Sequence, residues 1–307
     1  MANRVFYASQ GVAISGSGAG SYTTVQGAQS VSVTSNFGLE QAFQLGHIAI
    51  YDNVVTTPEV TCTVSKVLDG YDTIYKLATG GGTLASNAND RCDIKVAVGN
   101  DASTSLSGTK SMMMTGMYLS SVSYTMPVEG NMTEECAFIG DSKVMDTGVV
   151  SAPTNSGTRV LRRQHFKLAG AGSTLPAEVS GQNITNVTIN ADLGRDAMYR
   201  LGQFAPHFRY VNFPLEVTCA FECDATGVDE VKVALTGVTC QSDGDLPQKS
   251  QITIALCDYT DGSSVYTFNL GSGNRLSSVD YGGGDTGGGN ATVTYNYTTY
   301  NELDISG

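Results

Sequence analysis

The chain has no tryptophan and little charge: only 15% of its 307 residues are Asp, Glu, Lys or Arg. Glu, Lys and Leu, which favour helices, are sparse, whereas Gly, Ser, Thr and Asn are abundant. This balance favours strands, turns and loops over long helices. Because 41% of the residues are hydrophobic, the chain can still bury a core.

Long apolar runs and clusters of basic residues are also lacking. The sequence has no run of about 18 apolar residues, so we expect no membrane-spanning helix. The first twenty or so residues lack the basic stretch and apolar core of a signal peptide. The net charge is −12, and an acidic chain does not hold nucleic acid through its phosphates, because that requires clustered Lys and Arg. It could still surround nucleic acid without holding it, since like charges repel.

The seven cysteines form no recognisable framework. Their number is odd and their spacing irregular, and a zinc site would require a second close pair besides Cys219 and Cys223. On a strand, these two would face the same side, too far apart to bridge easily. We therefore expect buried free thiols and synthesis in a reducing cytosol.

Signatures of catalysis are missing as well. The sequence contains no GxSxG, no HExxH and no phosphate-binding glycine loop. The histidines are His47, His165 and His207, and none has a partner at a recognisable spacing, so we expect structural roles for them. The sequence thus predicts no enzyme, and it offers no catalytic, cofactor-binding or metal-binding residues.

Several short segments recur in the same order in the two halves of the chain. VSVTSNFGLEQAFQLG at residues 31–46 matches VTINADLGRDAMYRLG at residues 187–202. YLSSVSY at residues 118–124 likewise matches RLSSVDY at residues 275–281. Three shorter matches keep the same order. Between the two longer matches, VTC occurs at residues 60–62 and 217–219, and IKVAV at residues 94–98 resembles ITIAL at residues 252–256. After them, GNMT at residues 130–133 resembles GNAT at residues 289–292. Because ordered matches indicate an internal repeat, we predict a tandem duplication.

The predicted boundary between the copies lies in a segment rich in Gly, Ser, Thr and Pro, as linkers and turns are. This segment covers residues 140–158, and we place the two domains at residues 1–148 and 149–307. The basic run RRQHFK follows at residues 162–167. In an acidic chain, it indicates a solvated or interface-facing strand rather than a phosphate-binding patch.

Alternation of apolar and polar residues, typical of strands, dominates both copies. One short helix per copy is also expected. Residues 68–82 place apolar side chains three and four positions apart, and Asp69 can cap the start of such a helix. The partner segment at residues 226–237 is less clearly helical.

A late hairpin is expected to close each copy. Residues 118–140 contain two alternating strands around the turn MPVEGN, and residues 275–300 repeat this pattern around a longer, Gly-rich turn. Such a hairpin can project beyond a small barrel or sandwich, and its open edges then need a cover, often from another subunit. The predicted fold class is mainly β: two tandem β-sandwich or barrel domains, each with a flanking short helix and a long β-hairpin.

This combination resembles the phage tail tube protein family. The strongest part of the resemblance covers residues 119–140, and a weaker echo covers residues 276–300. Most such proteins have one domain and form hexameric rings that stack into a tube. The resemblance implies that three copies of this duplicated chain form a pseudo-hexameric ring in the tail of a bacteriophage virion, assembled in the host cytoplasm. If each domain gives four strands, about 24 strands would line the lumen.

The same resemblance implies the partners of the chain: further copies of itself, other tail proteins, and double-stranded DNA that passes through the lumen without specific binding. No membrane and no cofactor are implied. Acidic side chains on the wall would repel phosphates and keep the path open. The candidates for lumen or ring contacts are Glu129, Glu134, Glu135, Asp280 and Asp285. Only some of them can face the lumen, because a strand presents half of its residues to each side.

Two other readings stay open at this point. The chain could be the tube protein of a bacterial contractile injection or secretion system, which would carry effectors instead of DNA. It could also be a carbohydrate-binding β-sandwich on a phage or cell surface. Such a protein would expose aromatic platforms; the lack of tryptophan counts against it, although 15 tyrosines leave it possible.

Overall fold

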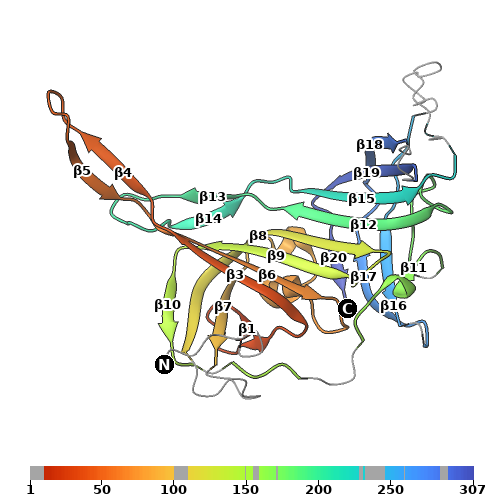
Figure 1. The fold of residues 1–307 in the computed structure, drawn as a ribbon, viewed down its shortest axis with the longest axis horizontal. Coiled ribbons are helices and arrows are strands. Elements are labelled where there is room, and N and C mark those ends of the chain that lie inside the picture. Colours follow the sequence, from red (N-terminus) through yellow and green to blue (C-terminus); the bar gives the residue numbers. More distant parts are fainter. Residues whose placement is uncertain are drawn as a thin grey trace.

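The computed structural model of the chain describes residues 10–99, 110–148, 150–154, 159–170, 172–227, 231, 246–258, 260–283 and 290–307. Antiparallel strands make up most of this part of the chain, and the helices are short (Figure 1). The predicted fold class, mainly β with sandwich-like layers, is therefore confirmed. Within the described residues, no helix is both long enough and apolar enough to cross a membrane.

The strands up to residue 148 are β1 (Gln10–Gly16), β2 (Thr23–Thr24), β3 (Ala28–Asn36), β4 (Leu39–Phe43), β5 (Ile50–Val55), β6 (Glu59–Val67), β7 (Arg91–Val98), β8 (Lys110–Pro127), β9 (Thr133–Gly140) and β10 (Lys143–Asp146). The later strands are β11 (Phe166–Lys167), β12 (Asn183–Asp192), β13 (Arg195–Met198), β14 (Phe208–Val211), β15 (Glu216–Asp224), β16 (Thr253–Cys257), β17 (Ser264–Asn269), β18 (Arg275–Gly282), β19 (Thr292–Tyr300) and β20 (Asp304–Ser306). The helices are α1 (Ile74–Thr79), α2 (Leu84–Asn87) and the 3-10 helix η2 (Arg163–His165).

Eight strands form one continuous antiparallel path, which we call the main sheet. Their order is β3-β6-β9-β8-β12-β15-β19-β18. Strand β8 is long enough to pair with β7 along its first part, which extends the sheet to β1 and β2, and with β9 and β12 along its second part. The pair β8–β12 therefore joins the two halves of the chain into one sheet.

The main sheet consists of two four-strand units with the same internal plan. The first unit is β3-β6-β9-β8, and the second is β12-β15-β19-β18. Val31 lies opposite Val64 in the first unit, and at the matching positions Val187 lies opposite Phe221 in the second. Even the irregularity in the last strand recurs, just after Leu119 in β8 and just after Leu276 in β18. Strand order, register and bulge position are thus shared by the two units.

One face of the main sheet packs on the core, which both halves share. The alternation predicted from the sequence is seen clearly in β6, where Val60, Cys62 and Val64 are buried and the residues between them are only half-buried. The C-terminal segment closes over the first half, where the Leu84 amide donates to the Leu303 carbonyl at 2.8 Å. A single apolar cluster runs through both halves. The division of the chain at residues 148/149 stays a prediction, and it does not separate two cores.

The helix predicted at residues 68–82 is shorter than expected and starts later. Thr73 caps α1, because its side chain accepts a hydrogen bond from the Lys76 amide at 3.2 Å, and Gly80 ends the helix at a φ of 69°. Asp69 is not the cap. Its carboxylate instead lies 3.2 Å from the buried ammonium of Lys66. Most of the second expected helix, at residues 226–237, lies outside the described residues.

The two late hairpins exist, but they do not project. β8–β9 and β18–β19 are antiparallel pairs within the main sheet. The hairpins that project are β4–β5 and β13–β14, which follow β3 and β12 and extend from one end of the molecule (Figure 1). They lie in the segments at residues 31–46 and 187–202 that revealed the repeat, and in the residues that follow these segments. Their hairpin structure was not foreseen, since the apolar residues of LEQAF and RDAM do not alternate regularly.

The cysteines in the described chain carry free thiols. Cys219 and Cys223 are both buried on the core side of β15, as the four-residue spacing predicts. Burial raises the pKa of the Cys62 thiol to about 12. Cys62 is therefore a protonated packing group at neutral pH. Cys240 lies outside the described residues.

Candidate functional site

The main sheet has one face that the described part of its own chain leaves without a core, and we call it the polar face. It consists of the odd-numbered residues of β6 (up to Ser65), β9 and β8 (from Ser121 on) and the even-numbered residues of β3, β12 (from Asn186 on), β15, β19 and β18 (from Ser278 on). The registers place these residues side by side, for example Ser123 between Glu135 and Asn190. All of them are half-buried or exposed. Ser, Thr and Asn predominate, with Ala and Ile at a few positions.

The charge on the polar face has one sign. Its acidic residues are Glu59, Glu135, Asp192, Glu216, Glu222, Asp224 and Asp280. The basic residues of these eight strands lie elsewhere: Lys66 is buried on the core side, Lys110 lies in the part of β8 that pairs with β7, and Arg275 precedes the bulge in β18. A surface of hydroxyls, amides and carboxylates repels a polyanion and offers it no cation.

The residues predicted for the lumen or ring contacts fall in different places. Glu135 and Asp280 are exposed on the polar face, and Glu129 is exposed in the turn between β8 and β9. Glu134 is fully buried on the opposite side of β9, so its own chain encloses it. Asp285 lies outside the described residues.

The acids of β12 and β15 were missed by sequence reasoning, although a signal for them existed. In EVTCAFECD, the buried residues are Val217, Cys219, Phe221 and Cys223. The acids of this segment have the opposite parity and must therefore face away from the core. The predicted acids all lie in the late hairpins, whereas the same alternation also identifies the exposed acids of β12 and β15.

Glu134 holds α1 against the main sheet. Its two carboxylate oxygens accept hydrogen bonds from the Ile74 amide at 2.7 Å, from the Tyr75 amide at 2.9 Å and from the Tyr124 hydroxyl at 2.8 Å. Burial raises the pKa of the Glu134 carboxyl, while these hydrogen bonds and the charge of Lys66 oppose the rise. The role of this acid is structural.

Both ends of the main sheet are free. Among the described strands, β3 pairs only with β6, and β18 pairs only with β19. An unpaired edge presents a row of free backbone N–H and C=O groups to another strand. The free edges carry few devices that block such pairing, since neither strand contains a proline and both exceed seven residues. β3 is the first strand of the first unit, and β18 is the last strand of the second. Their counterparts in the other unit, β12 and β8, pair with each other at the centre of the sheet.

The central pair β8–β12 shows how one unit joins another. The Val128 amide donates to the Thr185 carbonyl at 2.7 Å, and the Leu193 amide donates to the Ser120 carbonyl at 2.8 Å. Hydrogen-bonded pairs alternate with non-bonded pairs in an antiparallel ladder. The odd-numbered residues of β12 therefore form backbone hydrogen bonds with β8, and the even-numbered residues form them with β15. Asn190 and Ser123 form a non-bonded pair, and their side-chain oxygens lie 2.6 Å apart on the polar face.

The hairpin β13–β14 of the second unit is fastened to the first unit by two arginines. The Arg195 Nε donates to the Leu119 carbonyl at 2.7 Å, and its guanidinium lies 5.2 Å from the centre of the Tyr118 ring. Burial lowers the pKa of Arg195 to about 10, so it stays charged at neutral pH. Arg209 is nearly buried and pairs with Asp141 and, at 3.8 Å, with Glu59.

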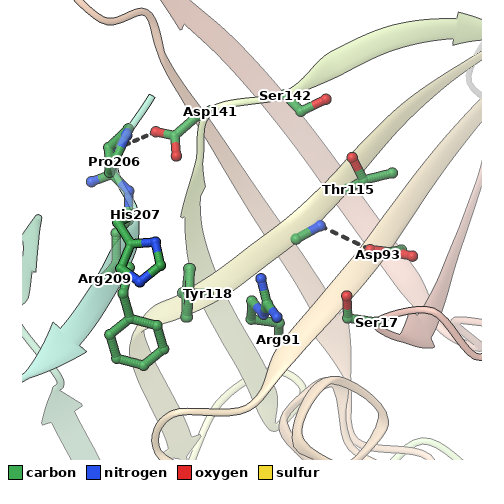
Figure 2. Close-up of a pocket in the computed structure, with 12 residues that line it drawn as sticks. Ser17, Arg91, Asp93, Thr115, Tyr118, Asp141, Ser142, Pro206, His207 and Arg209 are labelled. Atoms are coloured by element: carbon green, nitrogen blue, oxygen red, sulfur yellow. Dashed lines mark hydrogen bonds and ion pairs between the residues drawn. The ribbon is translucent and has the colours of Figure 1, made fainter. Parts of the chain in front are cut away.

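These contacts surround a polar pocket of about 370 Å³ between the first unit and the hairpin. Figure 2 shows Asp141 reaching Arg209 on one side, while Arg91 and Asp93 line the other side. Phe208 and Tyr118 also line the pocket, and their rings meet edge-on at a centroid distance of 5.9 Å. Arg209 and Asp141 pair across the joint, and the pocket is best explained as part of the contact between the two units.

Replacing Arg209 with alanine is expected to lower the free energy of unfolding by about 1–3 kcal/mol, because Asp141 and Glu59 lose their shared cation at a nearly buried position. The measurement is urea unfolding followed by circular dichroism. Arg200→Ala is the matched control: Arg200 is exposed in the loop of the same hairpin, and we expect a change within about 0.5 kcal/mol. Equal effects of the two substitutions would show that the joint does not depend on this ion pair.

The hairpin β4–β5 of the first unit has no such seat among the residues that the structure describes. Its register is the same, since Leu39 pairs with Val55 as Arg195 pairs with Val211. Yet Leu39 is 65% exposed and Val55 51% exposed, whereas Val211 is 5% exposed. Phe37, just before the hairpin, is 67% exposed, whereas its counterpart Leu193 is buried. The same positions are therefore covered in one unit and bare in the other.

Comparisons with solved structures give weak likenesses, two of which are described below. No family model matches the chain, and no curated protein matches it. The tube terminating cap of the anti-feeding prophage is similar over 48% of this chain and 94% of its own, with 13% identity and a TM-score of 0.36. A chain of the anti-feeding prophage baseplate is similar over 47% of this chain and 97% of its own, with 7% identity and a TM-score of 0.34. At these values the likeness assigns no function, and the geometry of the chain itself has to carry the conclusion.

Proposed function

We propose that this chain is a structural subunit of a phage-tail-like tube, in which three chains close head to tail into a ring and the rings stack. The observation that carries the proposal is the main sheet itself: two like units are already joined by β8–β12, and the outer strands of this two-unit sheet are free. Heterologous contacts of this kind form a closed ring when the rotation per unit closes.

The joint between chains follows from the joint within the chain. β18 is the counterpart of β8, and β3 is the counterpart of β12, so β18 of one chain pairs with β3 of the next. Carrying over the β8–β12 register places Asp280 opposite Thr34 and Val279 opposite Ser35 of the next chain. The outward N–H groups of β3 are then those of its odd-numbered residues. Edge strands that would invite uncontrolled aggregation are thereby covered.

The number of chains rests on the resemblance to tube subunits that form six-unit rings. Three chains supply six four-strand units, hence about 24 strands around the bore, more than the 16–18 strands that leave an aqueous channel in porins. The core covers one face of the main sheet, so the polar face lines the bore. Its hydroxyls and carboxylates would let a DNA duplex pass without holding it, because phosphate binding requires Lys or Arg.

Electron microscopy of the purified full-length chain, together with mass photometry, tests this function. We expect particles of three 32.2-kDa chains that appear as hollow rings or stacked tubes. A three-dimensional reconstruction should place Glu135 and Asp280 on the wall of the bore. Monomers at every concentration, as a carbohydrate-binding surface protein would give, or an assembly without a through-going channel would contradict the proposal.

A further inference from the structure

The bare hairpin β4–β5 has its counterpart β13–β14 seated on the neighbouring unit, and this difference points to a second contact. We propose that β4–β5 of one chain seats on the second unit of the next chain, where Asp52 forms an ion pair with Arg275. This inference rests on the proposed ring, and it adds the partner of the exposed hairpin. The occupant of the seat is a second copy of this chain.

The positions of the seat follow from the shared registers. Met198 pairs with Phe208 in the second hairpin, and Ala42 pairs with Asp52 in the first, so Asp52 is the counterpart of Phe208. In the last strands, Tyr118 lies opposite Ile139 and Arg275 lies opposite Thr298, each just before the bulge, so Arg275 is the counterpart of Tyr118.

Within the chain, Phe208 and Tyr118 are in direct contact at a centroid distance of 5.9 Å. The same positions in the joint between two chains hold a carboxylate and a guanidinium. Asp52 and Arg275 are both exposed in the single chain. An aromatic contact inside the chain is thus replaced by opposite charges between chains, and opposite charges across an interface favour correct pairing.

The remaining contacts of the seat are compatible with this pair. Asn53 takes the position of Arg209, and Tyr300, the last residue of β19 and the counterpart of Asp141, is 55% exposed. An amide and a phenol can meet there, and Glu216, the counterpart of Glu59, is exposed in the single chain. Phe37 takes the position of Leu193, whose amide bonds β8, so the exposed Phe37 ring is covered when β3 pairs with β18 of the next chain.

A charge swap tests the pair. Asp52→Arg and Arg275→Asp, each alone, place like charges in all three joints of a ring, and we expect each to raise the concentration needed for assembly at least tenfold. The double variant Asp52→Arg/Arg275→Asp restores opposite charges and should assemble within about threefold of the unchanged protein. Arg200→Glu, in the loop of the other hairpin, is the control for charge alone and should have no effect. Mass photometry over a dilution series reads the assembly, and circular dichroism confirms that each variant folds.

The outcomes separate this inference from the proposed ring. Rescue by the double variant supports the contact. Rings that form equally well with either single variant, or single variants that the double does not rescue, overturn the contact and leave ring formation intact. Failure of the unchanged protein to assemble at any concentration overturns both.

Discussion

Replacing Glu134 with alanine is expected to lower the free energy of unfolding by about 3–5 kcal/mol, the range observed when one partner of a buried charged network is removed. The Ile74 and Tyr75 amides and the Tyr124 hydroxyl would each lose the acceptor they have now. Each unsatisfied buried donor costs about 1–3 kcal/mol. Lys66, fully buried nearby, would keep only Asp69 and backbone carbonyls. Urea unfolding followed by circular dichroism measures the effect.

Glu135→Ala is the matched control for this substitution. Glu135 is the next residue of the same strand, but it is exposed on the polar face. Its removal should change the free energy of unfolding by no more than about 0.5 kcal/mol. If the two substitutions destabilised the chain equally, the assignment of Glu134 to the core and of Glu135 to the polar face would be wrong.

Replacing Ser35 with proline is expected to abolish assembly while the single chain stays folded. The counterpart of Ser35 is Ala191, an odd-numbered residue of β12, whose backbone forms hydrogen bonds with β8 and not with β15. The N–H of Ser35 therefore points toward the free edge of β3. Proline is tolerated at an edge strand when its missing N–H would face solvent. The loss of one hydrogen bond in each of three joints costs at least about 3 kcal/mol per ring, which is more than about 100-fold in the formation constant.

Thr34→Pro is the informative contrast. The N–H of Thr34 faces β6 by the same alternation, so this substitution should lower the stability of the single chain itself. Ser35→Ala keeps the backbone donor and should assemble normally. Mass photometry and thermal unfolding of the three variants give the comparison. Normal assembly of Ser35→Pro would contradict edge pairing through β3.

The strands and the repeat could be predicted from the sequence because both leave a direct pattern. Alternation in EVTCTVS and EVTCAFE reflects a sheet with one buried face, and the registers of β3–β6 and β12–β15 agree with the matched segments. The late hairpins were also predicted correctly. Their role was not, because the sequence does not show that β12 covers the open side of β8.

The errors have physical causes that particular residues show. Glu134 and Glu135 are adjacent acids, so one of them had to face the core. Cys136 and Phe138, which are buried, share the parity of Glu134, and this signal could have identified the buried acid. Asp69 satisfies the rules for a helix cap, but a tertiary contact, the pairing with Lys66, determines its place. The projecting hairpins could not be predicted, because the apolar residues of LEQAF and RDAM do not alternate regularly and Leu39 and Val55 are exposed in the single chain.

The pairing of β18 with β3 is tested most directly by a disulfide between chains. Thr34 and Asp280 are the counterparts of Asn190 and Ser123, whose side chains touch in a non-bonded pair that suits a cross-strand disulfide. Oxidised Thr34→Cys/Asp280→Cys should migrate on a non-reducing gel as species of two and three linked chains and no larger. Asn190→Cys/Ser123→Cys should cross-link within one chain and keep the monomer mass. Monomers alone from Thr34→Cys/Asp280→Cys, under conditions in which the second pair is fully oxidised, would contradict a ring closed through these two edges.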